Sequence, residues 1–281
     1  MSFVAILGSG ALGGAVAHAL ALRERVDEVR LIDNQPSVAR GKALDILQSS
    51  PIDGFSTRVT SAESIDAAAG AAVIVVADNA ADNAEYAGES GLAVLRRIAT
   101  VEGQAPIVCA GASQRPLIAK AVTELRLRTN RIVGSAPFAL ESALRALAGL
   151  ALDGTGTEVA LRIVGVPPRD AVVGWEEGSV GGQPLSALLP AHTIAGLGAR
   201  IPGLWPPGPF ALGAACARVV EALAAGSRRT YSCFVAIDAG PVRTAVASMP
   251  LEFQPGSVKR VLEPALTRLE RTRLENALEC S

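Results

Sequence analysis

Short apolar runs alternate with helix-forming stretches along the first half of the chain. A short apolar run bounded by turn residues is typical of a buried strand, whereas a longer amphipathic or Ala- and Leu-rich stretch is typical of a helix. The predicted strands are 3–7, 29–32, 57–60, 71–77, 106–110 and 131–133. The predicted helices are 12–25, 37–48, 91–101 and 116–128, with Pro51 beyond the end of the second and a polar loop over 78–90. This alternation predicts an α/β fold with a doubly wound parallel sheet.

The pattern changes near residue 135. From there the predicted strands are 158–166, 171–175, 231–237 and 242–248, with turns at 181–182 and 238–241. The predicted helices are 139–150, two segments interrupted by the Pro- and Gly-rich stretch 201–209, of which the second is 210–225, and a long C-terminal helix over 257–280. Mixed strands and helices of this kind predict an α+β domain. We therefore expect two domains, 1–135 and 136–281.

A glycine-rich turn joins the first strand to the first helix. The residues are Gly8-Ser-Gly-Ala-Leu-Gly13, and Asp33 ends the second strand twenty residues later. A dinucleotide-binding Rossmann unit has this order: a strand, the turn G-x-G-x-x-G, a helix, a second strand and an acidic residue. In it Gly8 permits the tight turn, Gly10 lets the backbone approach a pyrophosphate, and Gly13 lets the helix pack closely. The helix N-terminus favours the pyrophosphate, because its free N–H groups point at the ligand.

The acid decides between the two nicotinamide dinucleotides. Asp33 is expected to accept hydrogen bonds from the adenine ribose hydroxyls, and no Arg follows it in Asn34-Gln35, so NAD is favoured over NADP. The alternative is a glycine turn that binds nothing. The predicted cofactor-binding residues are Gly8, Gly10, Ala11, Leu12, Gly13, Asp33, Ala77 and Asn79.

The composition of the chain gives no indication of a nucleic-acid-binding, membrane or metal-binding protein. The 281 residues are 49% hydrophobic, and the formal net charge of −1 gives no attraction to nucleic acid or to an anionic membrane. The uncharged stretch 178–199 contains glycines and prolines that argue against a membrane helix, and no basic leader precedes the first strand. Cys109, Cys216, Cys233 and Cys280 lack metal-ligand spacing, so we expect reduced thiols in a cytoplasmic protein and no metal site.

Several stretches resemble the malate/lactate dehydrogenase family, nearer its malate dehydrogenase branch. They are Gly8–His18, Val29–Asp33, Gly41-Lys-Ala-Leu-Asp-Ile-Leu-Gln48, Ala71–Val76, Ser179-Val-Gly-Gly-Gln-Pro-Leu185 and the tail from Met249 to Leu278. The resemblance implies an oxidoreductase-type fold with a Rossmann domain, an α+β substrate-type and dimerisation domain, and NAD. It also implies a homodimer or tetramer in which the helix 37–48 packs against a second subunit. Because that segment carries more apolar residues than one monomer face needs, we expect a homodimer.

The positions that match the family's proton-transfer residues are substituted. Moving a hydride between a 2-hydroxy acid and nicotinamide needs a base for the hydroxyl proton, in this family a His held by an Asp. Counting back from Val180-Gly-Gly182, the His position is Pro167. The family's Leu-Asp-Ser-Ala-Arg segment, which supplies the Asp and the Arg for the substrate carboxylate, matches Leu140-Glu-Ser-Ala-Leu144. The Asp is therefore Glu141 and the Arg is Leu144, with Arg145 about 100° away on a helix.

The mobile loop and the turn after the fifth strand also depart from the family. The loop usually carries two arginines, and its ungapped counterpart places Asp82 and Gly88 there. The family's Thr-Asn-Pro is Ala110-Gly-Ala112, and Asn79 stands where the family usually has Gly beside the cofactor. The loop acids, which have no balancing cation in the loop itself, predict either a solvated surface or a cationic or polyhydroxylated ligand. They are Asp78, Asp82, Glu85 and Glu89.

Three functions remain open. The first is a NAD-binding relative that has lost the family chemistry and serves as a nucleotide-binding or regulatory protein, with an unknown small molecule as a further ligand. The second is an active NAD-dependent oxidoreductase on a different, non-dicarboxylate hydroxy substrate. The third is a structural or interaction protein without a nucleotide. No catalytic residue is assigned, since the remaining candidates have no supporting context. They are Tyr86, Lys120 and Asp170 as bases, Arg169 as an anion ligand, and His18 and His192, for which packing or surface positions are favoured.

Overall fold

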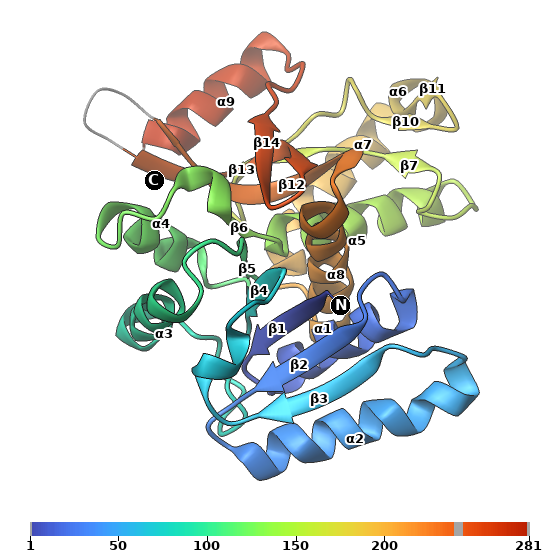
Figure 1. Cartoon of the computed structure of the whole chain (residues 1–281). Helices are drawn as coiled ribbons and strands as arrows, with labels where there is room; N and C mark the ends of the chain where they lie inside the picture. The colour runs from blue at the N-terminus through green and yellow to red at the C-terminus, as the bar shows by residue number, and fades with distance from the viewer. Residues whose placement is uncertain (1, 239–243, 280–281) are drawn as a thin grey trace.

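The first half of the chain forms a parallel sheet with helices on both faces. The computed structural model describes residues 2–238 and 244–279 (Figure 1). The strands of this half are β1 (Phe3–Leu7), β2 (Glu28–Ile32), β3 (Arg58–Ala62), β4 (Val73–Val76), β5 (Ile107–Cys109) and β6 (Ile132–Gly134). The helices are α1 (Ala11–Arg23), α2 (Pro36–Asp53), α3 (Gly88–Val101) and α4 (Arg115–Thr123), with short 3₁₀ turns η1 (Ile65–Ala68) and η2 (Thr129–Arg131).

The strand order is β3-β2-β1-β4-β5-β6, and every pair within it is parallel. The order reverses between β1 and β4, which is the point where doubly wound sheets bind ligands beyond the carboxyl ends of their strands. All four residues of β4 are completely buried, because helices cover both faces of a parallel sheet. The predicted α/β fold class is therefore confirmed, and the glycine turn lies at the ligand-binding edge of the sheet.

The second half adds antiparallel strands and further helices. The strands are β7 (Val159–Ala160), β8 (Ile163–Val166), β9 (Asp170–Val173), β10 (Ser179–Val180), β11 (Gln183–Pro184), β12 (Ser227–Asp238), β13 (Thr244–Gln254) and β14 (Ser257–Val261). The helices are α5 (Ala136–Ala151), α6 (Leu185–Leu188), α7 (Ala191–Ala199), α8 (Pro209–Ala225) and α9 (Arg268–Glu279), with a 3₁₀ turn η3 (Ile201–Leu204). In Figure 1 most of these elements lie beyond β6, whereas α8 packs against α1 of the first half.

The main sheet continues from one half into the other. Phe234 of β12 pairs with Gly134 of β6, and the sheet proceeds through β13 and β8 to β9. One hydrophobic core includes residues from both halves, while a second, smaller core fills the space among α5, α7 and β8. Residue 135 therefore lies between a parallel and an antiparallel part of one sheet. The division into domains at this position stays a prediction.

The long C-terminal helix predicted over 257–280 is wrong in its first part. The residues from Ser257 to Val261 form β14, which pairs with β13 through a tight turn at Pro255-Gly256. Gly256 has a φ of +80°, which glycine adopts without the Cβ penalty of other residues. Pro264 follows, and the helix begins only at Arg268. The turn that ends a strand and the proline together exclude a continuous helix over this stretch.

Other element boundaries also shift. Helix α2 runs through Pro51 to Asp53, because a proline in the exposed last turn removes only one hydrogen bond. Helix α4 ends at Thr123 instead of 128, and the strand predicted over 158–166 is two separate strands, β7 and β8. The turn predicted at 238–241 falls mostly outside the described residues, as does Cys280. Cys109, Cys216 and Cys233 are buried and free, and burial raises the pKa of each thiol.

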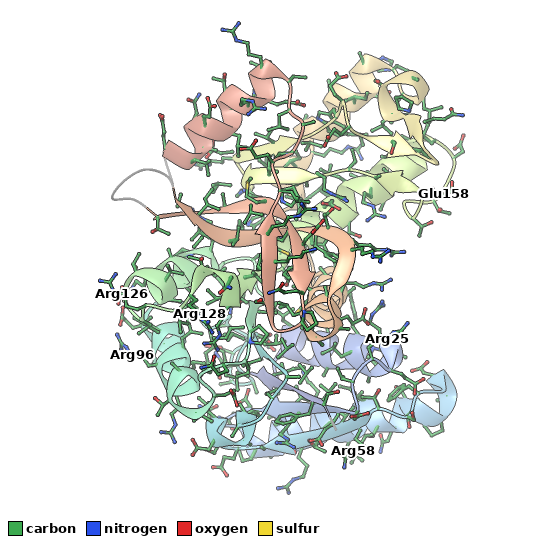
Figure 2. The ribbon with its side chains drawn as sticks, turned by 45° about the horizontal axis from the view of Figure 1, so that its top comes forward. Arg25, Arg58, Arg96, Arg126, Arg128 and Glu158 are labelled. Atoms are coloured by element: carbon green, nitrogen blue, oxygen red, sulfur yellow. The ribbon has the colours of Figure 1, made fainter. Side chains whose placement is uncertain are left out.

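The arginines labelled in Figure 2 do not gather on one face of the molecule. In Figure 2 Arg58 lies by the α2 edge of the molecule, whereas Arg96, Arg126 and Arg128 lie together near α3 and α4. Within the described residues, no helix is both long and apolar enough to cross a membrane. In the same residues no cluster of His, Cys, Asp or Glu has a composition that could hold a metal ion.

Candidate functional site

The glycine turn is packed directly against the end of β4. Gly8 has a φ of +101° and donates its N–H to the Ile32 carbonyl at 2.8 Å. A Cβ added to Gly8 would lie 2.1 Å from the Asp78 carbonyl oxygen, and one added to Gly13 would lie 2.1 Å from the Gly8 carbonyl oxygen. Neither position has room for a side chain. The turn thus holds the N-terminus of α1 close to the second residue after β4.

That residue, Asp78, places its carboxylate on the N-terminus of α1. Oδ2 accepts the Leu12 N–H at 2.9 Å and Oδ1 accepts the Gly13 N–H at 2.7 Å. The side chain is almost completely buried, with 2% of its residue surface exposed. Burial raises the pKa of Asp78, although both N–H bonds and the nearby Lys42 ammonium favour the charged form. These amides are among the groups that a dinucleotide pyrophosphate needs at this turn.

Asp33 is also engaged by the backbone around it. Oδ2 accepts the N–H groups of Ser9 at 2.8 Å and Ala80 at 3.0 Å, and Oδ1 accepts the Gln35 N–H at 2.9 Å. Asp33 is 2% exposed. The carboxylate therefore stands at the end of β2, where a ribose-binding acid belongs, but Ala80 covers it.

The other predicted binding residues surround the same turn. Ala11 donates its N–H to Asn83 Oδ1 at 2.8 Å. Asn79 does not project into the site, because Oδ1 accepts the N–H groups of Ala81 and Asp82 and stabilises the following turn. Ala77 is completely buried, and its carbonyl accepts the Tyr86 N–H at 3.0 Å. Leu12 and Gly13 contribute through their backbone amides, and Gly10 through a carbonyl that accepts from Lys42 Nζ at 2.6 Å.

A dinucleotide therefore fits this site only in part. The strand order, the glycine turn and the position of Asp33 suit NAD, but the carboxylate of Asp78 occupies the amides for its pyrophosphate. Two negative groups cannot share the same N–H donors, since the remaining charge would be buried without a partner. In this conformation the residues present do not fit the whole cofactor.

The loop acids have different surroundings, so they are not one solvated set, and a changed ligand stays a prediction. Asp78 is buried, and Glu85 accepts the N–H groups of Ala112 at 2.9 Å and Ser113 at 2.8 Å. Glu89 pairs with Lys120 at 2.7 Å, which supplies the cation that the loop sequence lacks. Asp82 is exposed and accepts the Ala84 N–H. Two of the four acids thus bind backbone amides of neighbouring turns.

The positions matched to the family's catalytic groups are buried in apolar or paired surroundings. Leu144 is completely buried in the smaller hydrophobic core, and Pro167 is buried as well. Glu141 is completely buried, accepts Ser232 Oγ–H at 2.6 Å and lies 3.3 Å from Arg162 Nη1. Burial raises the pKa of Glu141 to about 6, with Arg162 and Ser232 opposing the shift. Glu141 is therefore a structural partner of Arg162 in this chain.

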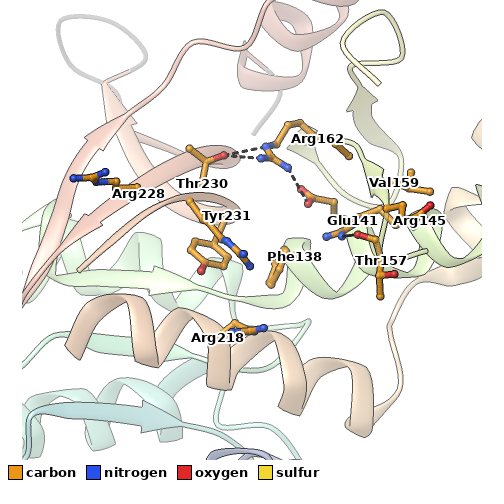
Figure 3. A pocket seen from close by; sticks show the side chains of 13 residues that line it. Phe138, Glu141, Arg145, Thr157, Val159, Arg162, Arg218, Arg228, Thr230 and Tyr231 are labelled. Carbon is orange, nitrogen blue, oxygen red and sulfur yellow. Dashed lines mark hydrogen bonds and ion pairs between the residues drawn. The ribbon is translucent and has the colours of Figure 1, made fainter. Parts of the chain in front are cut away.

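Glu141 is one of the residues that line a basic pocket of about 490 Å³ (Figure 3). Arg162 joins Glu141 to Thr230, whose Oγ1 accepts from Nη2 at 2.7 Å. Arg145 also lines this pocket, and its Nε is buried without a hydrogen-bond partner. The remaining cationic lining residues are Arg218, Arg228 and Arg229.

The candidate bases are not brought together. Burial raises the pKa of Tyr86 to about 12, and Asp33 and Asp78 add to the shift, so its hydroxyl is held protonated at neutral pH. Lys120 is paired with Glu89, and that pairing raises its pKa. Arg169 is exposed in the turn before β9, and Asp170 is exposed as the first residue of that strand. His18 is partly exposed, 3.7 Å from Asp53, and His192 is exposed on α7.

Comparison with known proteins identifies the class. Residues 3–101 match the family model for the NAD binding domain of lactate/malate dehydrogenase. A malate dehydrogenase of Thermomicrobium roseum is 26% identical over 292 residues, covering 98% of this chain and 94% of that protein. The malate dehydrogenase structure from Aeropyrum pernix superposes with a TM-score of 0.88 at 20% identity, covering 99% of this chain and 95% of that one.

A second structure has the same fold. The Cryptosporidium parvum lactate dehydrogenase, complexed with lactic acid and nicotinamide adenine dinucleotide, gives a TM-score of 0.86 at 21% identity, with 99% and 95% coverage. The molecule thus has the fold of these dehydrogenases, with a Rossmann NAD binding domain in its first half. Over nearly its whole length it is similar to lactate and malate dehydrogenases, and residues 3–101 match the NAD binding domain of that family. NAD is the cofactor that the matched domain supports.

Sequence reasoning missed the roles of four side chains around the glycine turn. They are Asp78 and Asn83 on the α1 N-terminus, Glu85 on the turn after β5, and Lys42 on the Gly10 carbonyl. For Asp78 a signal was present, because an acid directly after a buried parallel strand lies at the same sheet edge as the glycine turn. The other three contacts depend on how the loop folds back.

Proposed function

We propose that this chain is a NAD-binding member of its family that does not dehydrogenate 2-hydroxy acids and acts as a nucleotide-binding or regulatory protein. The observation that carries the proposal is the surroundings of Glu141 and Leu144. Glu141 is paired with Arg162 inside the protein and Leu144 belongs to a hydrophobic core. Neither side chain can orient a base or bind a substrate carboxylate from there. The chain has only two histidines, and His18 and His192 both lie outside buried sites.

Two other functions are weighed against this one. An active oxidoreductase on a different hydroxy substrate needs a base, and the pKa values of Tyr86 and Lys120 are both shifted upward, away from that role. A structural protein without a nucleotide is favoured by one specific observation, the Asp78 carboxylate on the amides of Leu12 and Gly13. Direct measurement of NADH binding separates this second candidate from the proposed function.

Calorimetric titration with NADH is expected to show binding that depends on Asp33. Replacing Asp33 by Ala deletes a charged hydrogen-bond acceptor for the ribose and should weaken binding by about 1–3 kcal/mol. Asp27→Ala is the matched control, because Asp27 precedes β2 at its other end and accepts one backbone N–H from Ser2. Thermal melting of both variants shows whether either has lost its fold. Absence of NADH binding to the parent protein at millimolar ligand would refute nucleotide binding.

We also propose a homodimer through α2 and the start of α8. Large apolar side chains are exposed there although they belong to well-formed helices: Leu44 is 54%, Ile52 88% and Phe210 83% exposed. A groove of about 440 Å³ between α1, α2 and α8 adjoins Phe210. Exposed apolar residues that cluster around a groove are typical of protein–protein contacts.

Light scattering at micromolar concentration is expected to give twice the chain mass of 28.7 kDa. The double substitution Leu44→Asp and Phe210→Asp should give monomers, because it buries charge in the proposed interface. Leu150→Asp is the control, since Leu150 is 70% exposed on α5, away from this surface. A monomeric mass for the unsubstituted protein would remove the proposal.

A further inference from the structure

The segment 78–86 folds into a compact turn over the carboxyl edge of the sheet. Asp78 and Glu85 form an antiparallel bridge, and the Asn79 N–H donates to the Ala84 carbonyl at 3.0 Å. The Tyr86 N–H returns to the Ala77 carbonyl at 3.0 Å. The side chains of Asn79 and Asp82 stabilise the tip by accepting backbone N–H groups within it. The segment therefore has a defined structure of its own.

One side of this segment covers both places where the glycine turn would hold a dinucleotide. The carboxylate of Asp78 binds the amides of Leu12 and Gly13, and Asn83 Oδ1 accepts the Ala11 N–H. The Ala80 N–H donates to Asp33 Oδ2. Three successive amides at the start of α1 and the acid at the end of β2 are thus satisfied by one stretch of nine residues.

The far end of the segment is fixed to the turn after β5. Glu85 binds the N–H groups of Ala112 and Ser113, and the Ser113 hydroxyl donates to the same carboxylate at 2.5 Å. The buried Gln114 side chain donates to the carbonyls of Ala77 and Tyr86 at 3.1 Å and 3.0 Å. Anchoring at both ends keeps Asp78 in position, so removing its carboxylate from α1 requires the segment to shift.

We propose that the segment 78–86 is an internal occupant of the dinucleotide site, with the Asp78 carboxylate in place of the pyrophosphate. A ligand that carries a pyrophosphate binds only after it displaces this segment. The inference rests on the proposed nucleotide binding and adds the competition that limits it. The carboxylate and the pyrophosphate have the same charge and need the same N–H donors, so their occupancy is mutually exclusive. The apparent affinity falls in proportion to the fraction of molecules with the segment displaced.

The test compares Asp78→Gly and Asp78→Asn with Asp82→Asn as the matched control. Asp82→Asn makes the same charge change as Asp78→Asn in the same segment. The Asp82 carboxylate, however, accepts the Ala84 N–H within the segment and not an amide of α1. NADH, ADP and adenosine are titrated into each protein by calorimetry. Asp78→Gly should bind NADH and ADP about tenfold or more tightly than the parent. Adenosine, which has no pyrophosphate, should gain much less, and Asp82→Asn should leave all three affinities unchanged.

Backbone amide hydrogen exchange without ligand tests the contact independently of binding. The amides of Leu12 and Gly13 should exchange faster in Asp78→Asn than in the parent protein and keep their parent rates in Asp82→Asn. Thermal melting identifies a variant that has not folded. If Asp78→Gly does not fold, the milder Asp78→Asn is compared with the parent protein instead.

The outcomes separate this inference from the proposed function. If the parent binds NADH and Asp78→Gly binds it no better, the competition is refuted while nucleotide binding stands. If only Asp78→Gly binds NADH, the competition is supported and nucleotide binding by the parent is refuted. If no variant binds NADH, both are overturned. Unchanged exchange of the Leu12 and Gly13 amides in Asp78→Asn also overturns the internal occupant.

Discussion

Purified protein is expected to reduce NAD with malate or lactate at less than about 1 s⁻¹, the low end of ordinary enzymes. No base stands at Pro167, and general acid–base catalysis typically contributes about 10²–10⁴-fold. Leu144 offers a substrate carboxylate an apolar core in place of a bidentate donor. Loss of an electrostatic group that polarises the carbonyl typically costs about 10²–10³-fold. These losses need not multiply, because such residues act as a unit, but the largest one alone leaves a very poor dehydrogenase.

The assay follows NADH absorbance with saturating NAD and either malate or lactate. The Thermomicrobium roseum malate dehydrogenase, assayed in parallel with malate, verifies the conditions. Because an occupied cofactor site alone would slow the reaction, Asp78→Gly is assayed beside the parent protein. Both proteins are expected to stay below the limit. Turnover above about 1 s⁻¹ by either protein would refute the loss of 2-hydroxy acid dehydrogenation and would mean that the active site lies at other residues.

Replacing Arg162 by Met is expected to destabilise the protein by about 3–5 kcal/mol at pH 8, because it removes the cation that is paired with the buried charge of Glu141 and leaves only the weaker effect of Arg145. Glu141 is completely buried, and Ser232 alone would remain as its hydrogen-bond donor. The pKa of Glu141 is already raised from 4.5 to about 6, and the loss of Arg162 should raise it further. A carboxyl whose pKa is raised in the folded state favours folding below its unfolded pKa, and this contribution is lost as the pH rises through its folded pKa.

The cost of Arg162→Met should therefore be small at pH 4, where Glu141 is protonated in both proteins, and reach its full size at pH 8. Urea unfolding at the two pH values measures it. Arg97→Met is the control, because Arg97 and its partner Asp66 are both about half exposed and such pairs contribute about 1 kcal/mol or less. The double variant Arg162→Met, Glu141→Gln should recover most of the unfolding free energy that Arg162→Met loses at pH 8. An equal cost at both pH values would mean that Arg162 acts through packing and not through the charge of Glu141.

The glycine turn is retained in this chain, but a neighbouring carboxylate occupies its N–H groups. The glycine turn and Asp33 are the features that predict a dinucleotide, and both have the expected positions at the switch point of the sheet. The same features create exposed N–H groups that any well-placed carboxylate can satisfy. Asp78 does so from the end of β4. A glycine motif therefore identifies a place for an anion, and the surrounding residues decide which anion occupies it.

The sequence by itself determined the features that depend on local pattern. Buried parallel strands such as β4 are continuous apolar runs, and the glycine turn needs residues without a Cβ, so both were predictable without tertiary information. The alternation of strands and helices likewise determined the α/β fold class. Local pattern was less informative near the C-terminus. There the Pro255-Gly256 turn and pairing with β13 make 257–261 a strand although the sequence favoured a helix.

Only the tertiary structure decided what the polar side chains contact. Among the acids of the loop 78–90, Asp78 and Glu85 are bound by backbone amides while Glu89 pairs with Lys120. Glu141 is on a helix whose sequence does not reveal a partner, and Arg162 reaches it from the start of β8. Such contacts join residues far apart in the chain, and their energy depends on burial and on hydrogen-bond geometry. Burial and hydrogen-bond geometry are both set only when the elements pack together, so these contacts could not be assigned from the sequence.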